Sequence, residues 1–234
     1  FVVIILNAAA NAFNDYMDSE ADKINRPDRP IPKGAISKMT ALIAAILLFV
    51  AGITLSAFLN SDAFIVASLI AVPLMIAYSL WFKGWPLFGN IVIALILGLT
   101  FIFAGAAFGN LWGLIVPALL AFGFTLLREL VKDIADLEGD RSAGLRTFPV
   151  LAGEKKSAIL AIILSAMIGA GALIPYFLEF YGLKYLIILI FGIEFPLFYV
   201  LLTLVKSPTI TNCKRIAQIL KACIIVGLLA VYLG

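Results

Sequence analysis

The sequence predicts an all-α polytopic membrane protein, a bundle of transmembrane helices, on the basis of its composition, its hydropathy and the lengths of its apolar runs. Of its 234 residues, 63% are hydrophobic and 13% are charged, whereas soluble chains are about half apolar and about a quarter charged. The mean hydropathy is +1.11. Because a spanning helix needs about 20 mostly apolar residues, most of this chain is expected to lie in lipid.

Eight segments are long and apolar enough to be transmembrane helices in this chain. They are 1–16, 40–59, 63–82, 87–108, 112–128, 157–177, 183–205 and 215–233. The first is short and begins without an initiator Met. We therefore expect that this sequence starts inside a helix and that an upstream segment with a further helix precedes it.

The basic residues predict the orientation of the helices. Sixteen of the seventeen Lys and Arg fall in connections on one side, chiefly 17–39 and 129–156, and Lys184 is the exception. The positive-inside rule assigns that side to the cytoplasm. The chain is thus expected to be a multi-pass protein of the cell membrane with these two loops on the cytoplasmic side.

The composition also excludes several functions. The chain has no His, which removes His-based acid–base catalysis, Ser–His or Cys–His nucleophile pairs and His-bearing zinc sites. A net charge of +3 is too small to indicate nucleic-acid binding, and there is no P-loop for a nucleoside triphosphate. Cys213 and Cys223 have no metal-ligand spacing and are interpreted as packing residues.

Six of the eight aspartates form two copies of one pattern, Asp-x-x-Asp-x-x-x-Asp. The first copy is Asp15, Asp18 and Asp22, and the second is Asp133, Asp136 and Asp140. The copies are 118 residues apart and four predicted spans separate them. Since an even number of crossings returns the chain to the same face, the sequence predicts two parallel four-helix repeats whose acidic clusters face one cytoplasmic cavity.

Helical spacing extends each acidic cluster along its helix. Asn7, Asn11 and Asn14 share a face about 100° wide with the first copy, and Thr125 and Glu129 lie on a comparable face with the second. Facing carboxylates demand a cation, and oxygen ligands with phosphate favour Mg²⁺. Basic neighbours can bind diphosphate oxygens directly; they are Lys23, Arg26, Arg29, Lys33, Arg128, Lys132, Arg141 and Arg146.

Two signatures resemble those of the UbiA superfamily of intramembrane prenyltransferases. The first is Asn14-Asp15-x-x-Asp18-x-x-x-Asp22 followed by the run Asn25–Gly34, and the second is Asp133–Asp140 with Gly144 and Thr147-Phe148-Pro149-Val150. The resemblance implies nine helices around a central cavity in the full family and a single prenyltransferase domain over 1–234 that lacks its N-terminal helix. The Arg-Pro-Ile-Pro form, Arg29–Pro32, is most similar to archaeal digeranylgeranylglyceryl phosphate synthases.

The resemblance also implies roles for individual residues. Asn14, Asp18, Asp22, Asp136 and Asp140 would bind Mg²⁺ and diphosphate, with Asp15 and Asp133 beside them. Tyr78 and Lys83 resemble a Tyr–Lys pair near the diphosphate. Two polar residues within predicted spans are further candidates. Asn90 is interpreted either as a cavity residue or as a helix–helix hydrogen-bond partner, and Glu194 either as a cavity residue or as a protonated packing residue.

The expected reaction is Mg²⁺-dependent transfer of a prenyl group, geranylgeranyl in the favoured case, from its diphosphate to a lipid-like acceptor. The acceptor favoured by the resemblance is geranylgeranylglyceryl phosphate in archaeal ether-lipid synthesis. Alternatives are an aromatic quinone precursor or chlorophyllide as acceptor, a cation transporter, and a CDP-alcohol phosphotransferase. Membrane lipid surrounds the chain in each case, and no protein partner is implied.

Overall fold

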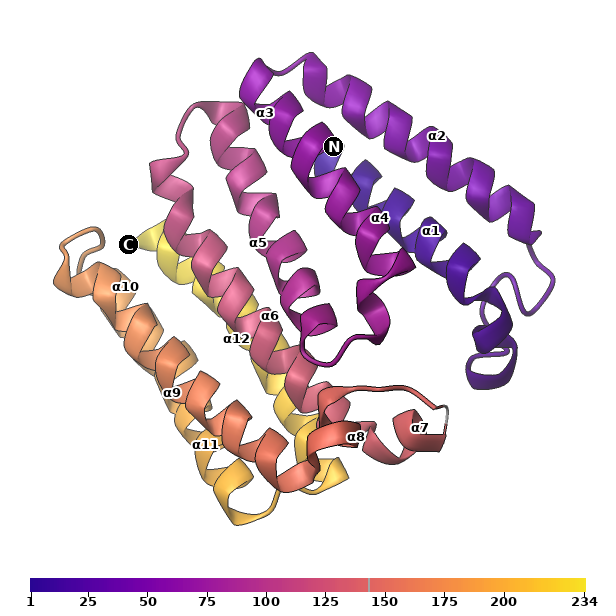
Figure 1. Ribbon diagram of the computed structural model, residues 1–234. Helices are drawn as coiled ribbons and strands as arrows, with labels where there is room; N and C mark the ends of the chain where they lie inside the picture. Colours follow the sequence, from indigo (N-terminus) through magenta and orange to yellow (C-terminus); the bar gives the residue numbers. More distant parts are fainter. Residues whose placement is uncertain (143) are drawn as a thin grey trace. The chain divides into compact units, whose positions relative to one another are not determined.

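The computed structural model describes residues 1–142 and 144–234, and within these residues all regular secondary structure is helical (Figure 1). This confirms the all-α prediction. Lipid offers no hydrogen-bond partners to the backbone, so a spanning segment has to satisfy its N–H and C=O groups within its own helix.

Six long helices are regular, and two more are built from three pieces each. The regular helices are α1 (Val2–Asn25), α2 (Lys38–Ala57), α5 (Phe88–Phe108), α6 (Ile115–Ala135), α9 (Glu154–Phe177) and α12 (Ile210–Leu233). The composite helices are α3 (Ser61–Ile65) with η1 (Val66–Ala71) and α4 (Val72–Leu80), and α10 (Leu183–Leu189) with η4 (Ile190–Glu194) and α11 (Phe195–Lys206). The short helices are η2 (Phe82–Gly84), η3 (Trp112–Leu114), α7 (Leu137–Ser142) and α8 (Phe148–Ala152).

Within the described residues, seven of these long helices are apolar enough to cross a membrane. They correspond to seven of the eight expected spans. The remaining segment, 1–16, forms the first part of α1, a longer helix whose apolar sequence is interrupted by asparagines and aspartates. The chain is thus a multi-pass membrane protein whose first helix is the most polar.

The helices divide into two compact units, 1–83 with 102–112 and 84–101 with 113–234. Unit 1 contains α1, α2 and the composite helix α3–η1–α4. Unit 2 contains α6 to α9, the composite helix α10–η4–α11 and α12, and α5 contributes a part to each unit. Unit 1 therefore holds the first three helices of the first predicted repeat, and unit 2 holds the helices of the second.

The composite helix of each unit contains a π-helical segment just before a proline. Segment η1 precedes Pro73 and η4 precedes Pro196. A proline inside a helix lacks the N–H donor and its ring collides with the carbonyl four residues earlier. A wider π turn at this point moves that carbonyl away from the ring, so both units accommodate their proline in the same way.

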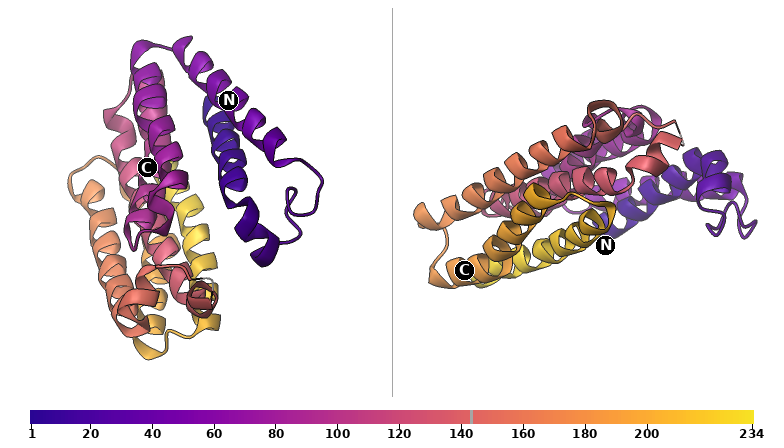
Figure 2. Two further views of the ribbon diagram at one scale, coloured as in Figure 1. Left: turned by 45° about the vertical axis from the view of Figure 1, so that its right-hand side comes forward. Right: turned by 90° about the horizontal axis from the view of Figure 1, so that it is seen from below.

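The core of unit 1 forms where α1 and α2 lie side by side (Figures 1 and 2). Leu6 of α1 is 4% exposed and contacts α2 at Gly52. A Cβ at Gly52 would lie 2.4 Å from Leu6 Cδ2. The close approach of these two helices therefore depends on glycine at this position, as is common between membrane helices.

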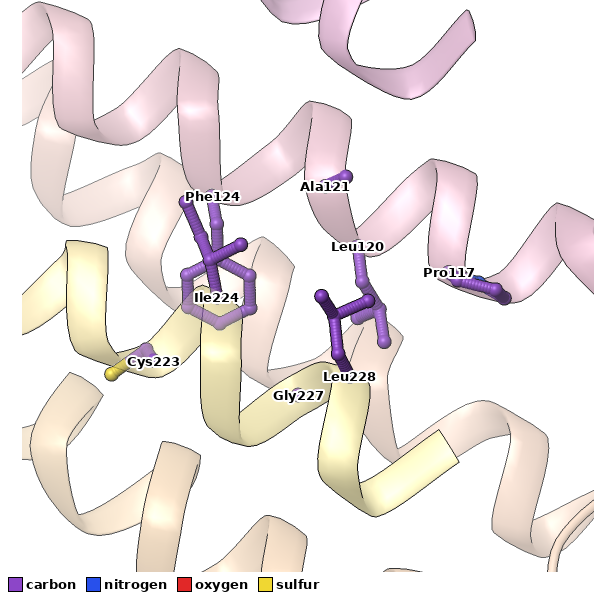
Figure 3. Close-up of a pocket in the computed structure, with 8 residues that line it drawn as sticks. All are labelled: Pro117, Leu120, Ala121, Phe124, Cys223, Ile224, Gly227 and Leu228. Atoms are coloured by element: carbon purple, nitrogen blue, oxygen red, sulfur yellow. The ribbon is translucent and has the colours of Figure 1, made fainter. Parts of the chain in front are cut away.

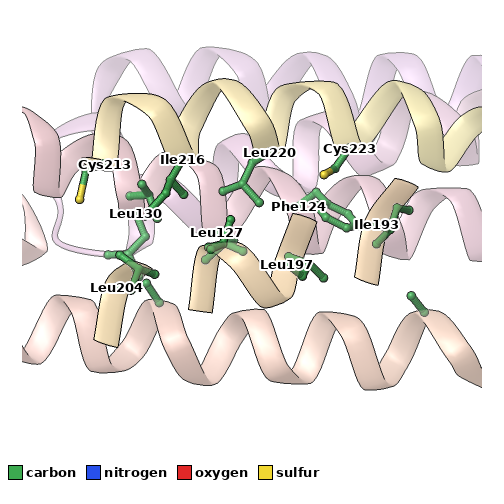
Figure 4. Close-up of a cluster of buried hydrophobic side chains, with 14 of the residues drawn as sticks. Phe124, Leu127, Leu130, Ile193, Leu197, Leu204, Cys213, Ile216, Leu220 and Cys223 are labelled. Atoms are coloured by element: carbon green, nitrogen blue, oxygen red, sulfur yellow. The ribbon is translucent and has the colours of Figure 1, made fainter. Parts of the chain in front are cut away.

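The core of unit 2 is built around α6, which packs against α9 and α12 (Figure 4). Leu127 and Leu130 of α6 are fully buried, and Cys213 and Cys223 of α12 are free and buried with them, as expected of packing residues. Farther along the same interface, α6 and α12 leave a void of only about 10 Å³ (Figure 3). This packing fixes α6, whose C-terminal end carries the second acidic motif.

The two motifs differ in backbone geometry although their spacing is identical. Helix α1 continues to Asn25, so the first part of the expected loop 17–39 is helical. Helix α6 ends at Ala135, and Asp136 leaves it with φ −99° and ψ 6° before α7 begins. The prediction that one helix face carries the whole second motif is therefore wrong, because the backbone departs from helical geometry at Asp136 and Asp140 lies in the separate short helix α7. The expected loop 129–156 consists largely of the end of α6, α7 and α8.

We predict that Gly52→Ala destabilises the protein, by about 1–3 kcal/mol, because the new methyl group collides with the buried Leu6 side chain. Thermal unfolding of the purified protein in detergent measures the effect as a lower midpoint. The matched control is Gly171→Ala in α9, since a Cβ at Gly171 would have no atom within 4 Å. An unchanged midpoint in the Gly52 variant would contradict the α1–α2 packing described above.

Candidate active site

The first acidic motif lies near the C-terminal end of α1. Helical spacing brings Asp15, Asp18 and Asp22 toward one side, and their side chains are 34%, 22% and 9% exposed. Carboxylates that are this shielded from water and this close together need cationic partners. Two basic side chains from other segments of unit 1 supply them.

Arg29 bridges two members of the motif. Its Nη1 donates to Asp15 Oδ1 at 2.6 Å and to Asp22 Oδ2 at 2.8 Å. The connection after α1 places it there through a series of turns, in which Arg29 N–H donates to the Arg26 carbonyl and Lys33 N–H to the Arg29 carbonyl. Two carboxylate oxygens thus converge on one cationic nitrogen.

Lys83 supplies the second cation. It lies in η2, after α4, and its Nζ forms an ion pair with Asp18 Oδ2 and lies 3.2 Å from Asn14 Oδ1. The structure thus places Lys83 beside the motif, as the sequence analysis expected, although its role in the reaction stays a prediction. Tyr78, half-buried on α4, precedes it by little more than one helical turn.

The donor set of the first motif suits a hard divalent cation. It consists of oxygen atoms, Asn14 and Asp18 around one cation position and Asp15 and Asp22 around another, and oxygen is the ligand that Mg²⁺ and similar ions prefer. Among the described residues, no group of three His, Cys, Asp or Glu side chains is close enough to hold a metal. An ion bound here would therefore need ligands beyond these side chains.

The second motif, in unit 2, has neutral hydrogen-bond donors instead. Asn90 of α5 donates to Asp133 Oδ2 at 2.8 Å, and Thr147 donates to Asp140 Oδ2 at 3.0 Å. Burial raises the pKa of Asp140, and the hydrogen bond from Thr147 acts in the opposite direction. Asp136, at the end of α6, is exposed.

Two cations expected to bind diphosphate share one carboxylate on α6. Glu129 accepts hydrogen bonds from Arg128 Nη1 and from Lys132 Nζ, the latter at 3.2 Å. Its own side chain is only 17% exposed. Glu129 therefore positions both cations at the end of α6, and its single negative charge balances only one of the two.

The other predicted diphosphate ligands lie on the surface of their units. Lys23 pairs with Glu20 at 2.9 Å, with both side chains more than half exposed. The remaining members of this group are exposed; they are Arg26, Lys33, Arg141 and Arg146. Glu194 lies in η4 with its carboxylate against Gly169 of α9, so it packs between two helices of unit 2.

Sequence reasoning left Glu129 and Thr147 out of the site. Both stand inside or beside the second motif. The i,i+3 spacing of Glu129 and Lys132 favours their ion pair, whereas nothing in the sequence indicates that Thr147 contacts Asp140. Asn90 carried one usable signal, because an amide at the start of an otherwise apolar span is costly unless it has a partner. The structure gives that partner as Asp133.

Comparison with known proteins places the chain in a family. A model of the UbiA prenyltransferase family matches residues 1–222. The digeranylgeranylglyceryl phosphate synthase of Natronomonas pharaonis is 40% identical over 188 residues, which are 80% of this chain and 68% of that protein. Its counterpart in Thermococcus kodakarensis is 34% identical over 231 residues, 98% of this chain and 82% of that protein. For the relative from Haloquadratum walsbyi the chain spans 66% of its length.

Solved structures lead to the same family. A structure of digeranylgeranylglyceryl phosphate synthase in membranes has a TM-score of 0.86 and 32% identity, over 100% of this chain and 83% of that one. A UbiA homologue from Archaeoglobus fulgidus, bound to DMAPP and Mg²⁺, has a TM-score of 0.73 at 20% identity over 100% of this chain and 88% of that one, and shows likeness of fold alone. With a family match over nearly the whole chain and relatives at 34–40% identity, the chain belongs to the UbiA family and is a prenyltransferase.

Proposed function

We propose that the chain transfers a geranylgeranyl group from its diphosphate to geranylgeranylglyceryl phosphate, in a reaction that depends on Mg²⁺. The observation that carries the proposal is the acidic face of α1, where paired oxygens converge on the cationic groups of Arg29 and Lys83. This arrangement has the ligands for a divalent ion and the cations for a diphosphate. Family membership favours prenyl transfer over a cation transporter or a CDP-alcohol phosphotransferase.

The choice of acceptor rests on charge and on the relatives. An acceptor that carries a phosphate needs cationic partners of its own, beyond those used for the diphosphate. The exposed Arg26, Lys33 and Arg146 provide such a surplus. The relatives that share 34–41% identity bear the name digeranylgeranylglyceryl phosphate synthase. An aromatic quinone precursor, which has no phosphate, would leave these cations without a partner.

The proposed step breaks the bond between the allylic carbon and the diphosphate oxygen while the acceptor hydroxyl forms a new C–O bond to that carbon. Arg29 and Lys83 stabilise the charge that develops on the departing diphosphate. Bound Mg²⁺ supplies further charge stabilisation at the diphosphate oxygens. The hydroxyl proton passes to water at the polar end of the site or to a nearby carboxylate. Apolar walls around the prenyl chain keep water from the allylic carbon.

We further propose that both acidic motifs serve one diphosphate on the cytoplasmic side of the membrane. The support is the sequence repeat, in which an even number of spans separates the two motifs, and the concentration of Lys and Arg in the same connections. Asp136 and Asp140 would then complete the ligand set that Asn14, Asp18 and Asp22 begin.

Incubating membranes that contain the protein with labelled geranylgeranyl diphosphate, Mg²⁺ and geranylgeranylglyceryl phosphate should give labelled digeranylgeranylglyceryl phosphate. Chromatography with mass detection identifies the product, and a chelator should abolish its formation. A panel with an aromatic quinone precursor and chlorophyllide as acceptors serves as control. Product formed from one of these acceptors and not from the glyceryl phosphate would refute the proposed acceptor.

Replacing Asp18, Asp22, Asp136 or Asp140 singly by Asn should lower turnover by about 10²–10³-fold, because each variant loses a charge that acts on the metal–diphosphate. Asp136 is exposed, so Asp136→Asn should leave the folded fraction almost unchanged, whereas Asp18→Asn and Asp22→Asn also weaken an ion pair with Lys83 or Arg29 and should unfold at a somewhat lower temperature. Initial rates, gel-filtration profiles and thermal unfolding measure these effects. Asp62→Asn, in the first turn of α3, is the matched control and should keep wild-type turnover. Near-normal rates in two or more of the motif variants would rule out the paired-motif site.

Cysteines introduced at Lys23 and Arg141, on a background without Cys213 and Cys223, should both react with a membrane-impermeant reagent from the cytoplasmic side only. They should also crosslink through a short bifunctional reagent, more readily when Mg²⁺ and a prenyl diphosphate are present. Labelling in right-side-out and inverted vesicles measures the sidedness. Reaction from opposite faces would exclude a parallel repeat and a shared diphosphate.

A further inference from the structure

We propose that Arg29 and Lys83 act as internal substitutes for the metal in the ligand-free enzyme. In this state they occupy the oxygen atoms of the first acidic motif, and they exchange those oxygens for diphosphate oxygens when metal and prenyl diphosphate bind. The proposal rests on the metal-binding role proposed above for α1. It adds that the same two cations hold the site together before any ligand arrives.

The contacts of Arg29 are those expected of a substitute cation. A single nitrogen, Nη1, is bonded to Asp15 Oδ1 and Asp22 Oδ2, so the two oxygens can be no more than 5.4 Å apart, the total of 2.6 and 2.8 Å. An Mg²⁺ ion with ligand distances of about 2.0–2.1 Å would hold them at no more than about 4.2 Å. Exchanging one cation for the other therefore requires only small shifts of the two carboxylates.

The contacts of Lys83 repeat this arrangement along the same helix. Its ammonium group is paired with Asp18 and lies 3.2 Å from the amide oxygen of Asn14. These two residues are predicted metal ligands, and the ammonium stands where both can reach one cation. Asn14 and the three aspartates of the motif are thus divided between two cationic groups.

Both cations come from segments outside α1. Arg29 lies in the turns that follow α1, and Lys83 in the short η2 helix after α4. By contrast, Lys23 lies on α1 itself and pairs with Glu20. Lys38, the first residue of α2, stands 4.9 Å over the ring of Tyr16. The groups that hold the motif oxygens can therefore be withdrawn without moving the helix that carries the ligands.

This arrangement has an energetic consequence for the order of binding. A metal ion that binds without diphosphate has to break ion pairs and leave Arg29 and Lys83 without anionic partners. With a diphosphate present, the released guanidinium and ammonium groups gain new oxygens. Metal and diphosphate should therefore bind cooperatively, and the free enzyme should bind metal alone weakly.

The test measures the binding of Mn²⁺ alone to the purified full chain in detergent, by electron paramagnetic resonance, without diphosphate. Arg29→Gln and Lys83→Gln should each bind Mn²⁺ about two- to tenfold more tightly than wild type, because a competing ion pair is gone. Lys38→Gln, which removes the same charge nearby, should bind it as wild type does. Arg29→Lys, which keeps the cation, should stay close to wild type.

A second measurement separates competition from general damage to the site. In a chelator, thermal unfolding of Arg29→Gln should begin at a lower temperature than that of wild type, and added Mn²⁺ should raise its midpoint by more. If Arg29→Gln does not fold, Lys83→Gln decides the question on Asp18. Unchanged or weaker Mn²⁺ binding in these variants, or an equal gain in Lys38→Gln, would overturn the proposal.

A failure of the proposal for Arg29 and Lys83 can be distinguished from a failure of the proposed prenyl transfer. Suppose that wild type forms the expected product while neither Gln variant gains Mn²⁺ affinity. The proposal that Arg29 and Lys83 take the place of the metal is then wrong, and the proposed prenyl transfer stands. If the Gln variants gain Mn²⁺ affinity while wild type forms no such product, the proposed prenyl transfer is wrong, and the proposal that Arg29 and Lys83 take the place of the metal stands.

Discussion

The requirement that backbone groups in lipid be satisfied within their own helix determines where this protein can place its chemistry. Long helices occupy the apolar depth of the membrane, and even the prolines Pro73 and Pro196 are accommodated by π turns that leave the helices continuous. Charged side chains then gather at helix ends and in the connections between helices. The acidic motifs obey this rule, because the first lies near the end of α1 and the second at the end of α6 and in α7.

Placing aspartates at these ends creates an electrostatic demand. The C-terminal end of a helix carries a partial negative charge of about half an electron, so Asp22, at the start of the last turn of α1, adds to a field that already opposes it. Because Asp22 is also nearly buried, water cannot offset the repulsion. Cations have to come from other segments, and Arg29 and Lys83 meet the demand within unit 1. The same demand is what makes the end of α1 suitable for a metal and a diphosphate.

Much of the fold followed from the sequence, whereas the contacts within the site did not. Run length and composition are enough to locate the helices, since a span needs a fixed number of apolar residues whatever it packs against. The repeat of the aspartates likewise marked both motifs. The end of α6 at Ala135 was missed, because identical spacing in two segments does not fix the backbone that carries it. The contacts of Lys83 with Asp18 and of Asn90 with Asp133 depend on how segments far apart in the sequence fold back on one another.

The partners of the two motifs differ in charge, and under the proposed function this difference would give the motifs different parts in binding. In the first motif the carboxylates are paired with Arg29 and Lys83, so a metal would have to displace these cationic groups. The displaced groups could then pair with the oxygens of a diphosphate. In the second, Asp133 and Asp140 are held by the neutral donors Asn90 and Thr147. A metal can approach these carboxylates while both hydrogen bonds persist, because each donor uses only one oxygen. Under the proposed function, the second motif would thus be oriented in advance, and the exchange of charge that couples metal to diphosphate would be confined to the first.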